Sequence, residues 1–374
     1  MILKNKKKIR IIIGSLNIGG TEKQLLEIIN FLAKKNWEIE LITLKEKGFL
    51  INNLNPKIKV TNLNIKSSSK ITNLFLIFYK LFKIFKKDSK TLTHFFLPQA
   101  YIIGMLAAIT ASSKCKLIMS RRSLNLYQNK YPLSRIIEKL LHKKVSKILV
   151  NSEAVKKQLV TEENVNKNKI KTIYNGINVK YRKKNNEFKN LKIIMIANLI
   201  PYKNHEMVLN SLKIIKNKLP KNWRILFIGR DDGIKNHLLK LSKKFRINKN
   251  IVFKETKNVN NFLKDSNLGI LCSKEESLPN SILEYLSYKI PVISSNVGGC
   301  REIIKNKRNG LLLKKNNSLE LSKAILYVLK NKNIAKKFSD EGLKIIKKRF
   351  TMNKMVNAHE KEYLKYVNPW HKKM

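Results

Sequence analysis

Acidic residues are scarce in this sequence. Its 374 residues include 25 Asp and Glu against 78 Lys and Arg, which gives a formal net charge of +53. Such an excess indicates either a polyanionic partner, nucleic acid or an anionic membrane surface, or lysines spread over all solvated faces. Only 11 of the basic residues are Arg, the residue that reads bases and binds phosphates bidentately, and the lysines are scattered. We therefore do not expect nucleic acid as the partner, and charge alone assigns no function.

Cysteine is also rare. Cys115, Cys272 and Cys300 are widely spaced, odd in number, and placed in or beside apolar runs. This pattern does not support a disulfide framework. It predicts buried thiols in a reducing compartment.

Long hydrophobic runs are missing as well. The apolar run near the N-terminus covers residues 9–13 only and contains Arg10, so it is too short for a signal-peptide core or a membrane span. We expect a cytoplasmic protein. Residues 71–87 show an amphipathic pattern of aromatic residues and lysines, which suits either a membrane surface or packing on a sheet. We favour packing, and keep peripheral attachment to the anionic inner face of the cell membrane as the alternative.

What is present is a repeated strand–helix pattern in a chain with 43% hydrophobic residues. Residues 9–44 read as a buried strand, a glycine turn, a helix and a second strand, which is the unit that builds doubly wound parallel sheets. A second such series begins at residue 191, after the polar stretch 180–190, which we interpret as a linker. The predicted fold class is therefore α/β, with two Rossmann-like doubly wound domains, residues 1–180 and 190–350, facing a cleft.

One loop gathers carboxylates in this basic chain. The stretch KEESLPNSILEYLSYKIPVI, residues 274–293, follows a buried strand and has Pro279 at the expected first position of a helix. The backbone N–H groups of such a first turn can hold a phosphate at the carboxyl end of a parallel strand. Glu284, a turn later, suits the vicinal hydroxyls of a sugar, and Glu276 suits a second sugar beyond the phosphates. Both fit a nucleotide diphosphate sugar, unless they only favour the helix N-terminus.

The segment ESLPNSILEYLSYKIPVISSNVGGCREII, followed by NGLLL, resembles the second-half signature of the retaining glycosyltransferases of family 4, also called group 1. IGSLNIGGTEKQLLEI is similar to the glycine loop of the family's first domain, and ANLIPYKNHEMVLNSL to its donor-phosphate loop. The resemblance implies the GT-B architecture of two facing Rossmann-like domains, with the final helix, residues 352–367, crossing back onto the first. It also implies a hexosyltransferase that moves a sugar from a nucleotide diphosphate sugar of UDP or GDP type to an acceptor, with retention, no metal and no other cofactor.

The resemblance further implies roles for individual residues. Glu276 and Lys203 are the expected catalytic pair, at the donor sugar and at the diphosphate leaving group respectively. The expected donor-binding residues are Glu284, Ser277, Leu278, Asn280, Asn198 and Arg230. The expected residues of the acceptor and phosphate loop are Gly19, Gly20, His94, Arg121 and Arg122.

The sequence departs from the family pattern in three ways. The first is Asn198, where the family often has an Arg five residues before the phosphate lysine, so another Arg would have to substitute. The candidates for that substitution are Arg230, Arg121 and Arg122. The second is the pair Arg121 and Arg122, near which the family often has a His beside the donor sugar, and the third is Ser277, which replaces a glycine. His94 keeps two interpretations, a group facing the cleft or a satisfied structural histidine.

The acceptor and the reaction stay open at this stage. The basic surface and residues 71–87 suit an acceptor carried on a lipid, as in surface polysaccharide or lipopolysaccharide synthesis. The alternatives are a sugar-nucleotide epimerase of the same architecture and a non-enzymatic polyanion binder. A nicotinamide dehydrogenase is not supported, because NIGGTE does not match G-x-G-x-x-G. These motifs do not determine the base, the sugar, the acceptor or the linkage.

Overall fold

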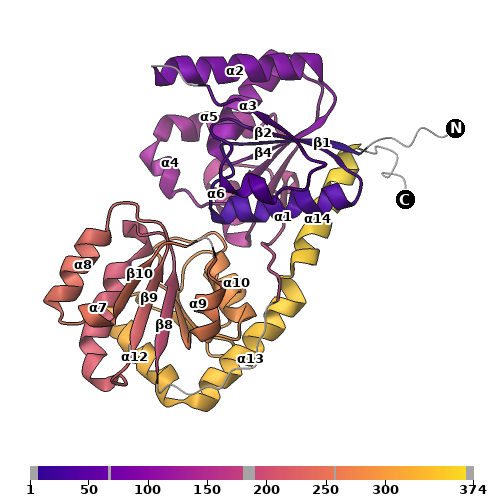
Figure 1. Ribbon diagram of the computed structural model, residues 1–374. Coiled ribbons are helices and arrows are strands. Elements are labelled where there is room, and N and C mark those ends of the chain that lie inside the picture. The colour runs from indigo at the N-terminus through magenta and orange to yellow at the C-terminus, as the bar shows by residue number, and fades with distance from the viewer. Residues whose placement is uncertain (1–6, 66–68, 180–189, 257, 368–374) are drawn as a thin grey trace. The chain divides into compact units, whose positions relative to one another are not determined.

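The chain folds into two compact units. The computed structural model describes residues 7–65, 69–179, 190–256 and 258–367. One unit is Met1–Gly176 together with Met352–Met374, and the other is Ile177–Thr351 (Figure 1). The stretch that we interpreted as a linker, residues 180–190, lies outside the described residues except for its last position.

Within the described residues, the first unit contains a seven-stranded sheet in the order β3-β2-β1-β4-β5-β6-β7, and all its strands are parallel. The strands are β1 (Lys8–Ile13), β2 (Glu38–Thr43), β3 (Lys59–Asn62), β4 (Leu92–Phe96), β5 (Leu117–Arg121), β6 (Lys147–Val150) and β7 (Ile170–Thr172). Strand β1, KIRIII, is buried along almost its whole length. A continuous β-branched run of this kind is typical of a parallel strand that is covered on both faces.

Helices cover both faces of this sheet. They are α1 (Gly20–Lys34), α2 (Lys70–Lys87), α3 (Pro98–Thr110), α4 (Leu126–Lys130), α5 (Pro132–His142), α6 (Glu153–Glu163) and α14 (Met352–Val367), with the 3₁₀ turns η1 (Phe49–Asn53) and η2 (Lys167–Lys169). α2, α3, α5 and α6 share one buried cluster, whereas α1 and α14 share another with the opposite side chains of the same strands. α14 packs against α1 (Figure 1). The Tyr363 ring of α14 contacts the rings of Trp37 and His94.

The second unit is built in the same way. Its strands, six in the part of the chain that the structure describes, are β8 (Lys192–Ile196), β9 (Arg224–Ile228), β10 (Ile251–Lys254), β11 (Leu268–Leu271), β12 (Val292–Ser295) and β13 (Leu311–Leu313). They pair in parallel in the order β10-β9-β8-β11-β12-β13. The predicted α/β class with two doubly wound parallel sheets is therefore confirmed.

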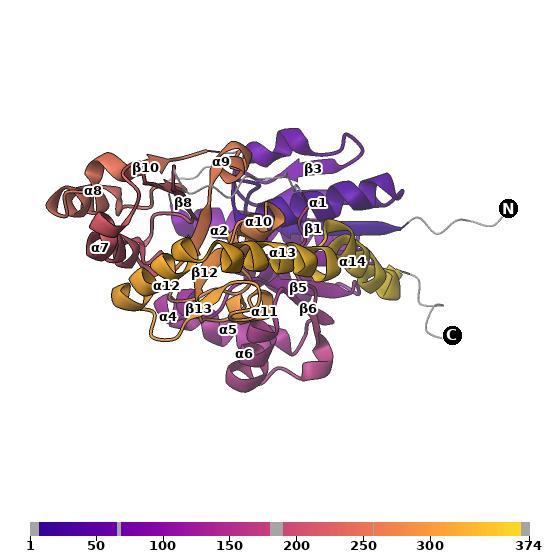
Figure 2. The same ribbon diagram turned by 90° about the horizontal axis from the view of Figure 1, so that it is seen from below.

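The helices of the second unit fall into two groups of neighbours. They are α7 (His205–Ile215), α8 (Lys235–Lys244), α9 (Asn260–Asp265), α10 (Asn280–Ser287), α11 (Cys300–Ile303), α12 (Ser318–Lys330) and α13 (Lys332–Arg349), with the 3₁₀ turns η3 (Pro201–Lys203), η4 (Lys216–Lys218) and η5 (Asn248–Asn250). α7 packs against α8 and α12, while α10 packs against α11 and α13. α12 and α13 also contact each other (Figure 2).

The amphipathic helix predicted over residues 71–87 is α2. The apolar stripe that it buries is narrower than the apolar pattern of its sequence indicates. α2 buries Ile77, Leu81 and Phe85. Leu74 and Phe75, which belong to the apolar pattern of residues 71–87, are 44% and 63% exposed. A helix that packs on a layer buries a stripe of only about 100°, and the apolar pattern of α2 is wider than that. Across the described residues, no helix combines the length and the apolar character needed to cross a bilayer.

The three cysteines are buried as free thiols. Burial raises the pKa of Cys272 and raises the pKa of Cys300 to about 12. The prediction of buried, unpaired thiols is confirmed.

A close contact between α3 and β4 allows a test of the packing in the first unit. A Cβ atom on Gly104 would lie 2.3 Å from Cε1 of Phe95, which is fully buried. We predict that Gly104→Ala lowers the free energy of unfolding of this unit by about 1–3 kcal/mol, because an overpacked core has to shift. The matched control is Gly14→Ala, where nothing lies within 4 Å of the added Cβ. Urea unfolding measures both, and equal midpoints would contradict the packing described here.

Candidate active site

The strand order of the second unit reverses between β8 and β11. In open parallel sheets, ligands bind outside the carboxyl ends of the strands at such a switch point. The loop after β8 leads into η3, which ends at Lys203, and the loop after β11 contains Glu276 and leads into α10. The two residues that the family resemblance singles out for catalysis therefore come from the two loops that flank this point.

Lys203 and Glu276 are in direct contact. The Lys203 ammonium donates to Oε1 of Glu276 at 2.6 Å, and the two side chains are only 15% and 10% exposed. Burial alone would lower the pKa of Lys203, but the Glu276 carboxylate and the Tyr202 hydroxyl outweigh it, so the pKa is raised above its ordinary value. The lysine therefore stays charged at neutral pH. A charged lysine held in place by a carboxylate is a fixed cation at the carboxyl ends of the strands.

Further contacts hold the Glu276 loop in position. The Ser273 hydroxyl donates to the same Oε1 at 2.6 Å, and the backbone N–H of Lys274 donates to the carbonyl of Tyr202 at 2.8 Å. On the other side, the N–H of Gly299 donates to the carbonyl of Glu276 at 3.1 Å. These bonds tie the loop to the segments that follow the neighbouring strands β8 and β12, so the carboxylate has little freedom.

Gly299 was missed in the residue assignments from sequence. A Cβ at this position would lie 1.8 Å from the carbonyl oxygen of Ser277, so only glycine allows the two backbones to approach this closely. The signal that could have indicated it is the GG pair of NVGGCREII, which we quoted only as part of the family signature. Gly299 shapes the loop and offers no side chain to a ligand.

The other expected donor-binding residues of this loop lie on or next to α10. Pro279 is the N-cap of this helix and not its first residue, with extended backbone angles of φ −74° and ψ 117°. The prediction of its position was wrong by one residue, because the φ that proline imposes suits an N-cap as well as a first turn. Ser277 and Asn280 are partly exposed on either side of it, and Leu278 is buried. Glu284 is partly buried and lies one turn into α10.

Asn198 and Arg230 form a separate cluster at the ends of β8 and β9. Both bind Asp232: the Arg230 guanidinium pairs with Oδ1 at 2.7 Å, and the Asn198 amide donates to Oδ2 at 3.3 Å. The N–H of Arg230 also donates to the Asn198 side-chain oxygen at 3.4 Å. Asn198 occupies the position where the family often has Arg, and Arg230 lies beside it. The neighbouring Asp231 accepts from the N–H of Gly233 at 2.9 Å, as a turn residue does.

In the first unit, the glycine loop lies near one of the two expected arginines. Gly19 is the N-cap of α1, in an extended conformation, and Gly20 is the first residue of the helix. A Cβ on Gly19 would meet the carboxylate of Glu22. Burial lowers the pKa of Arg122 to about 10, and the charge of Glu22 opposes this shift. Arg122 donates to Asn175, and the neighbouring Gly176 exchanges hydrogen bonds with Gln24 of α1, so Arg122 lies near the first turns of the helix that follows the glycine loop.

His94 is a buried structural residue. It lies in the interior of the first unit with no exposed surface. Its Nδ1 bonds to the hydroxyl of Tyr363 at 2.7 Å and its Nε2 to the hydroxyl of Ser120 at 2.9 Å. Burial, followed by the charges of His359 and Arg122, lowers the pKa of His94 well below its ordinary value, so the ring is neutral. Of the two interpretations left open, the structure supports the satisfied histidine that joins β4, β5 and α14.

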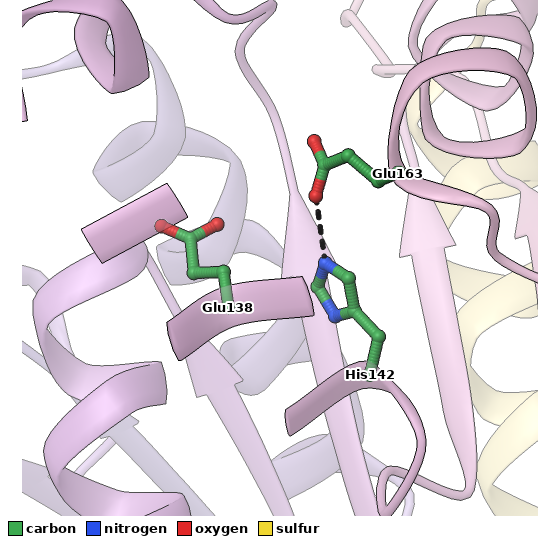
Figure 3. A group of neighbouring side chains, drawn as sticks. All are labelled: Glu138, His142 and Glu163. Carbon is green, nitrogen blue, oxygen red and sulfur yellow. Dashed lines mark hydrogen bonds and ion pairs between the residues drawn. The ribbon is translucent and has the colours of Figure 1, made fainter. Parts of the chain in front are cut away.

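Arg121 is also structural. Its guanidinium is buried and pairs with Glu138 of α5 and, at 3.2 Å, with Glu163 at the end of α6. His142 binds the other oxygen of Glu163 at 3.0 Å (Figure 3). Burial alone would raise the pKa of Glu163, but the His142 hydrogen bond and the Arg121 charge outweigh it and lower the pKa. The prediction that Arg121 serves the acceptor loop was wrong, because the side chain on a central strand turns into the helix layer where two carboxylates are buried.

The cluster Glu138, His142 and Glu163 was not noticed in the sequence. These side chains place potential metal ligands within 4.8 Å of one another (Figure 3). The spacing of Glu138 and His142 by one helical turn was the available signal. The Arg121 guanidinium already pairs with both carboxylates, and Tyr127 donates to Glu138 at 2.9 Å. The positive charge that a metal would supply is thus already present.

Comparisons with known proteins agree with the fold and the loop motifs. Residues 18–181 match the family described as Glycosyltransferase Family 4, and residues 178–345 match the family described as Glycosyl transferases group 1. An uncharacterized glycosyltransferase of Methanocaldococcus jannaschii is 26% identical, with 94% of this chain and 96% of the relative covered. The capsular polysaccharide biosynthesis glycosyltransferase CapH of Staphylococcus aureus is 26% identical, over 78% of this chain and 81% of its own.

Two further comparisons name ligands or acceptors of other proteins. The Campylobacter jejuni enzyme named as the α-1,4-N-acetyl-D-galactosaminyltransferase that acts on a diNAcBac-PP-undecaprenol-linked glycan is 26% identical, over 88% of this chain and 90% of its own. The crystal structure of HepE from Anabaena with UDP and glucose superposes with a TM-score of 0.82 and 16% identity, covering 96% of this chain and 99% of HepE. Such a structural likeness shows the shared GT-B fold.

The buried Arg121 network yields a stability prediction. Arg121→Met leaves Glu138 and Glu163 buried without their counter-charge and should lower the free energy of unfolding by about 3–5 kcal/mol. The matched control is Arg135→Met, because Arg135 pairs with Glu162 at 3.8 Å with both side chains about one-third exposed or more. We expect a change of about 0–1 kcal/mol there. Urea unfolding of both variants measures the difference, and similar midpoints would show that Arg121 does not hold the network.

Proposed function

The chain belongs to the group 1 and family 4 glycosyltransferases, and from this premise we propose that it transfers a hexose from a nucleotide diphosphate sugar to a lipid-linked acceptor. The transfer proceeds with retention of configuration and without a metal ion, at the cytoplasmic face of the cell membrane. Its product enters a surface polysaccharide or lipopolysaccharide. The donor is of UDP or GDP type, and UDP is our first choice.

The observation that carries the proposal is the contact of Lys203 with Glu276 at the switch point of a parallel sheet. An ammonium group has three N–H donors, and Glu276 engages one of them. The Tyr202 hydroxyl also interacts with the ammonium, and the remaining donor can bind an oxygen of a diphosphate. Because the pair is largely buried, its charges are poorly screened, and a fixed cation there stabilises the negative charge that develops on a leaving diphosphate.

The two glutamates have different tasks in this proposal. Glu276 is held by Lys203 and Ser273, and it accepts hydrogen bonds from hydroxyls of the donor sugar near the reacting carbon. Glu284, on α10, accepts from the two ribose hydroxyls, which a carboxylate can do with both oxygens. Between them, the N-terminal end of α10 offers the positive end of its helix dipole to the phosphates.

The reaction then needs no protein nucleophile. The bond between the anomeric carbon and the diphosphate oxygen breaks, and its electron pair goes to the phosphate. The acceptor hydroxyl oxygen forms the new bond on the same face, and its proton passes to the departing phosphate oxygen. Lys203 stabilises the charge on that phosphate in the oxocarbenium-like transition state. We assign Arg230 as the arginine that assists from beside Asn198, since both bind Asp232.

Relatives support the choice of substrates. The Campylobacter jejuni relative is named for an acceptor carried on undecaprenol diphosphate, and the Staphylococcus aureus relative is named for capsular polysaccharide biosynthesis. The Anabaena structure contains UDP and glucose. For this chain, we propose donors and acceptors of the same chemical classes.

Nucleotide binding is the first test. We predict that UDP or GDP binds with a micromolar dissociation constant in calorimetric titrations that contain EDTA, because no metal is required. Glu284→Ala should weaken binding by about tenfold or more, since a buried diol loses its acceptor. The control is Glu275→Ala, the neighbouring loop carboxylate, which should bind as the wild type does. Binding that needs Mg²⁺, or equal loss in both variants, would contradict the proposed donor site.

Turnover tests the role of Lys203. We predict that Lys203→Met lowers kcat by about 10²–10³-fold with a modest change in KM, because the lost charge acts mainly on the leaving group in the transition state. Lys274→Met is the matched control, since Lys274 lies in the facing loop and is exposed. Release of labelled nucleotide from UDP-hexoses and GDP-hexoses with a lipid diphosphate acceptor provides the assay. A near-normal kcat for Lys203→Met would remove Lys203 from the mechanism.

A further inference from the structure

Three neighbouring helices of the first unit form one layer over the sheet. α3 contacts both α2 and α5, and all three contribute to the same buried cluster. Their inner sides are therefore accounted for by the core. Their outer sides are exposed and unusually apolar.

The outer side of α5 shows this most clearly. Leu133, Ile136, Ile137 and Leu140 recur at helical spacing, so they share one face, and every one of them is exposed. Leu133 alone is 75% exposed. Large aliphatic residues clustered on one exposed helix face are costly in water and typically mark an interaction site.

The other two helices extend this apolar surface. α2 exposes Ile71, Leu74 and Phe75 in its first half and Tyr79 at its middle. α3 contains no charged residue at all, although it lies at the surface, where it exposes Leu106 and Ile109. Because α3 lies between α2 and α5, the apolar residues of the three helices belong to one layer.

The charges of this layer have one sign. α2 and α3 contain no Asp or Glu, and the one acidic residue of α5, Glu138, is buried against Arg121. Lys80, Lys83, Lys86 and Lys87 are exposed on the second half of α2. Asp88, directly after α2, is engaged by Lys8 and Arg10. The side of this layer that faces water thus consists of apolar side chains and positively charged lysines.

We propose that the outer face of α2, α3 and α5 is a docking surface for an anionic phospholipid bilayer. Apolar and aromatic residues beside lysines are what an interfacial helix needs, since the former enter the acyl boundary and the latter meet anionic headgroups. A second copy of the chain would be the other natural occupant of an apolar face. Two chains that each carry a formal charge of +53 repel each other, whereas an anionic bilayer attracts both the face and the chain as a whole.

This inference rests on exposed side chains of the first unit and not on the donor site of the second. It deepens the proposed function in one respect, because a lipid-linked acceptor lies in the bilayer that this face would meet. If the proposed glycosyl transfer is wrong, the docking surface can still be correct, and the reverse also holds.

Cosedimentation of the full chain with vesicles tests the docking surface. We expect strong binding to vesicles of phosphatidylcholine with about 30% phosphatidylglycerol at about 0.15 M salt, and weak binding to pure phosphatidylcholine. The triple variant Leu133→Gln, Ile136→Gln and Leu140→Gln should lower the partition coefficient by at least about tenfold. The matched control is Ile214→Gln, Leu319→Gln and Tyr327→Gln, three exposed apolar residues of the second unit, with an expected change of less than about twofold.

A pair of lysine variants separates this surface from the overall charge. Lys83→Gln, Lys86→Gln and Lys87→Gln in α2 should weaken binding by at least about tenfold. Lys240→Gln, Lys243→Gln and Lys244→Gln in α8 remove the same number of exposed charges and should weaken it by less than about twofold. Equal effects of the two sets would mean that total charge alone draws the protein to the vesicle, and the proposal would be overturned.

Two controls complete the experiment. Each variant is compared with the wild type by near-ultraviolet circular dichroism and urea midpoint, so that loss of binding is read only from folded protein. If the chain instead forms a dimer that the α5 variant disrupts, and vesicles do not bind, the occupant is a second copy and the lipid proposal is wrong. Glu284→Ala should lose nucleotide and keep vesicle binding, which distinguishes failure of the docking surface from failure of the donor site.

Discussion

A parallel sheet has to be covered by helices on both faces, and this requirement determines much of the structure. Strands such as β1 and β8 are apolar on both sides, and parallel neighbours can be joined only by crossovers that lay helices on those sides. Because the strand order reverses at β8, the loops after β8 and β11 lead into crossovers of opposite direction, and the two loops meet at the carboxyl ends of these strands, where such sheets bind ligands. The same requirement places α2, α3 and α5 as an outer layer over the first sheet. The candidate donor site and the apolar surface are thus two consequences of one architecture.

Within the second unit, electrostatic interactions fix the charged pair of the candidate donor site. A basic chain has many lysines, and most are solvated, but Lys203 is set apart because its loop is held against a carboxylate of the neighbouring loop. Burial disfavours the charged lysine, and Glu276 more than compensates for it. The pair is therefore charged and fixed before any ligand arrives, and a preorganised charge is more effective in catalysis than one that has to reorient.

Buried charge serves a different purpose in the first unit. Arg121 compensates two glutamates inside the helix layer, and His94 stays neutral between two hydroxyls. Neither contributes to a ligand site of this unit in the way that its position at a strand end suggested. Arg122, directly after the last residue of β5, donates to Asn175, and the charge of Glu22 acts on its pKa. Two adjacent arginines thus have different surroundings, and only Arg122 stays a candidate functional residue.

The sequence by itself determined the fold class, the two strand–helix series and the loop motifs, because apolar periodicity and glycine or proline turns are local properties of the chain. The family resemblance also indicated Lys203 and Glu276 as the catalytic residues, although the sequence interpretation placed Pro279 one residue too far into the helix. Only the tertiary structure decided that Lys203 touches Glu276, that Arg121 and His94 are structural, and that Gly299 has to be glycine. It alone also showed which apolar residues of α2 and α5 stay exposed. Each of these depends on residues far apart in the chain, whose meeting is set by how helices pack on a sheet and not by any local pattern.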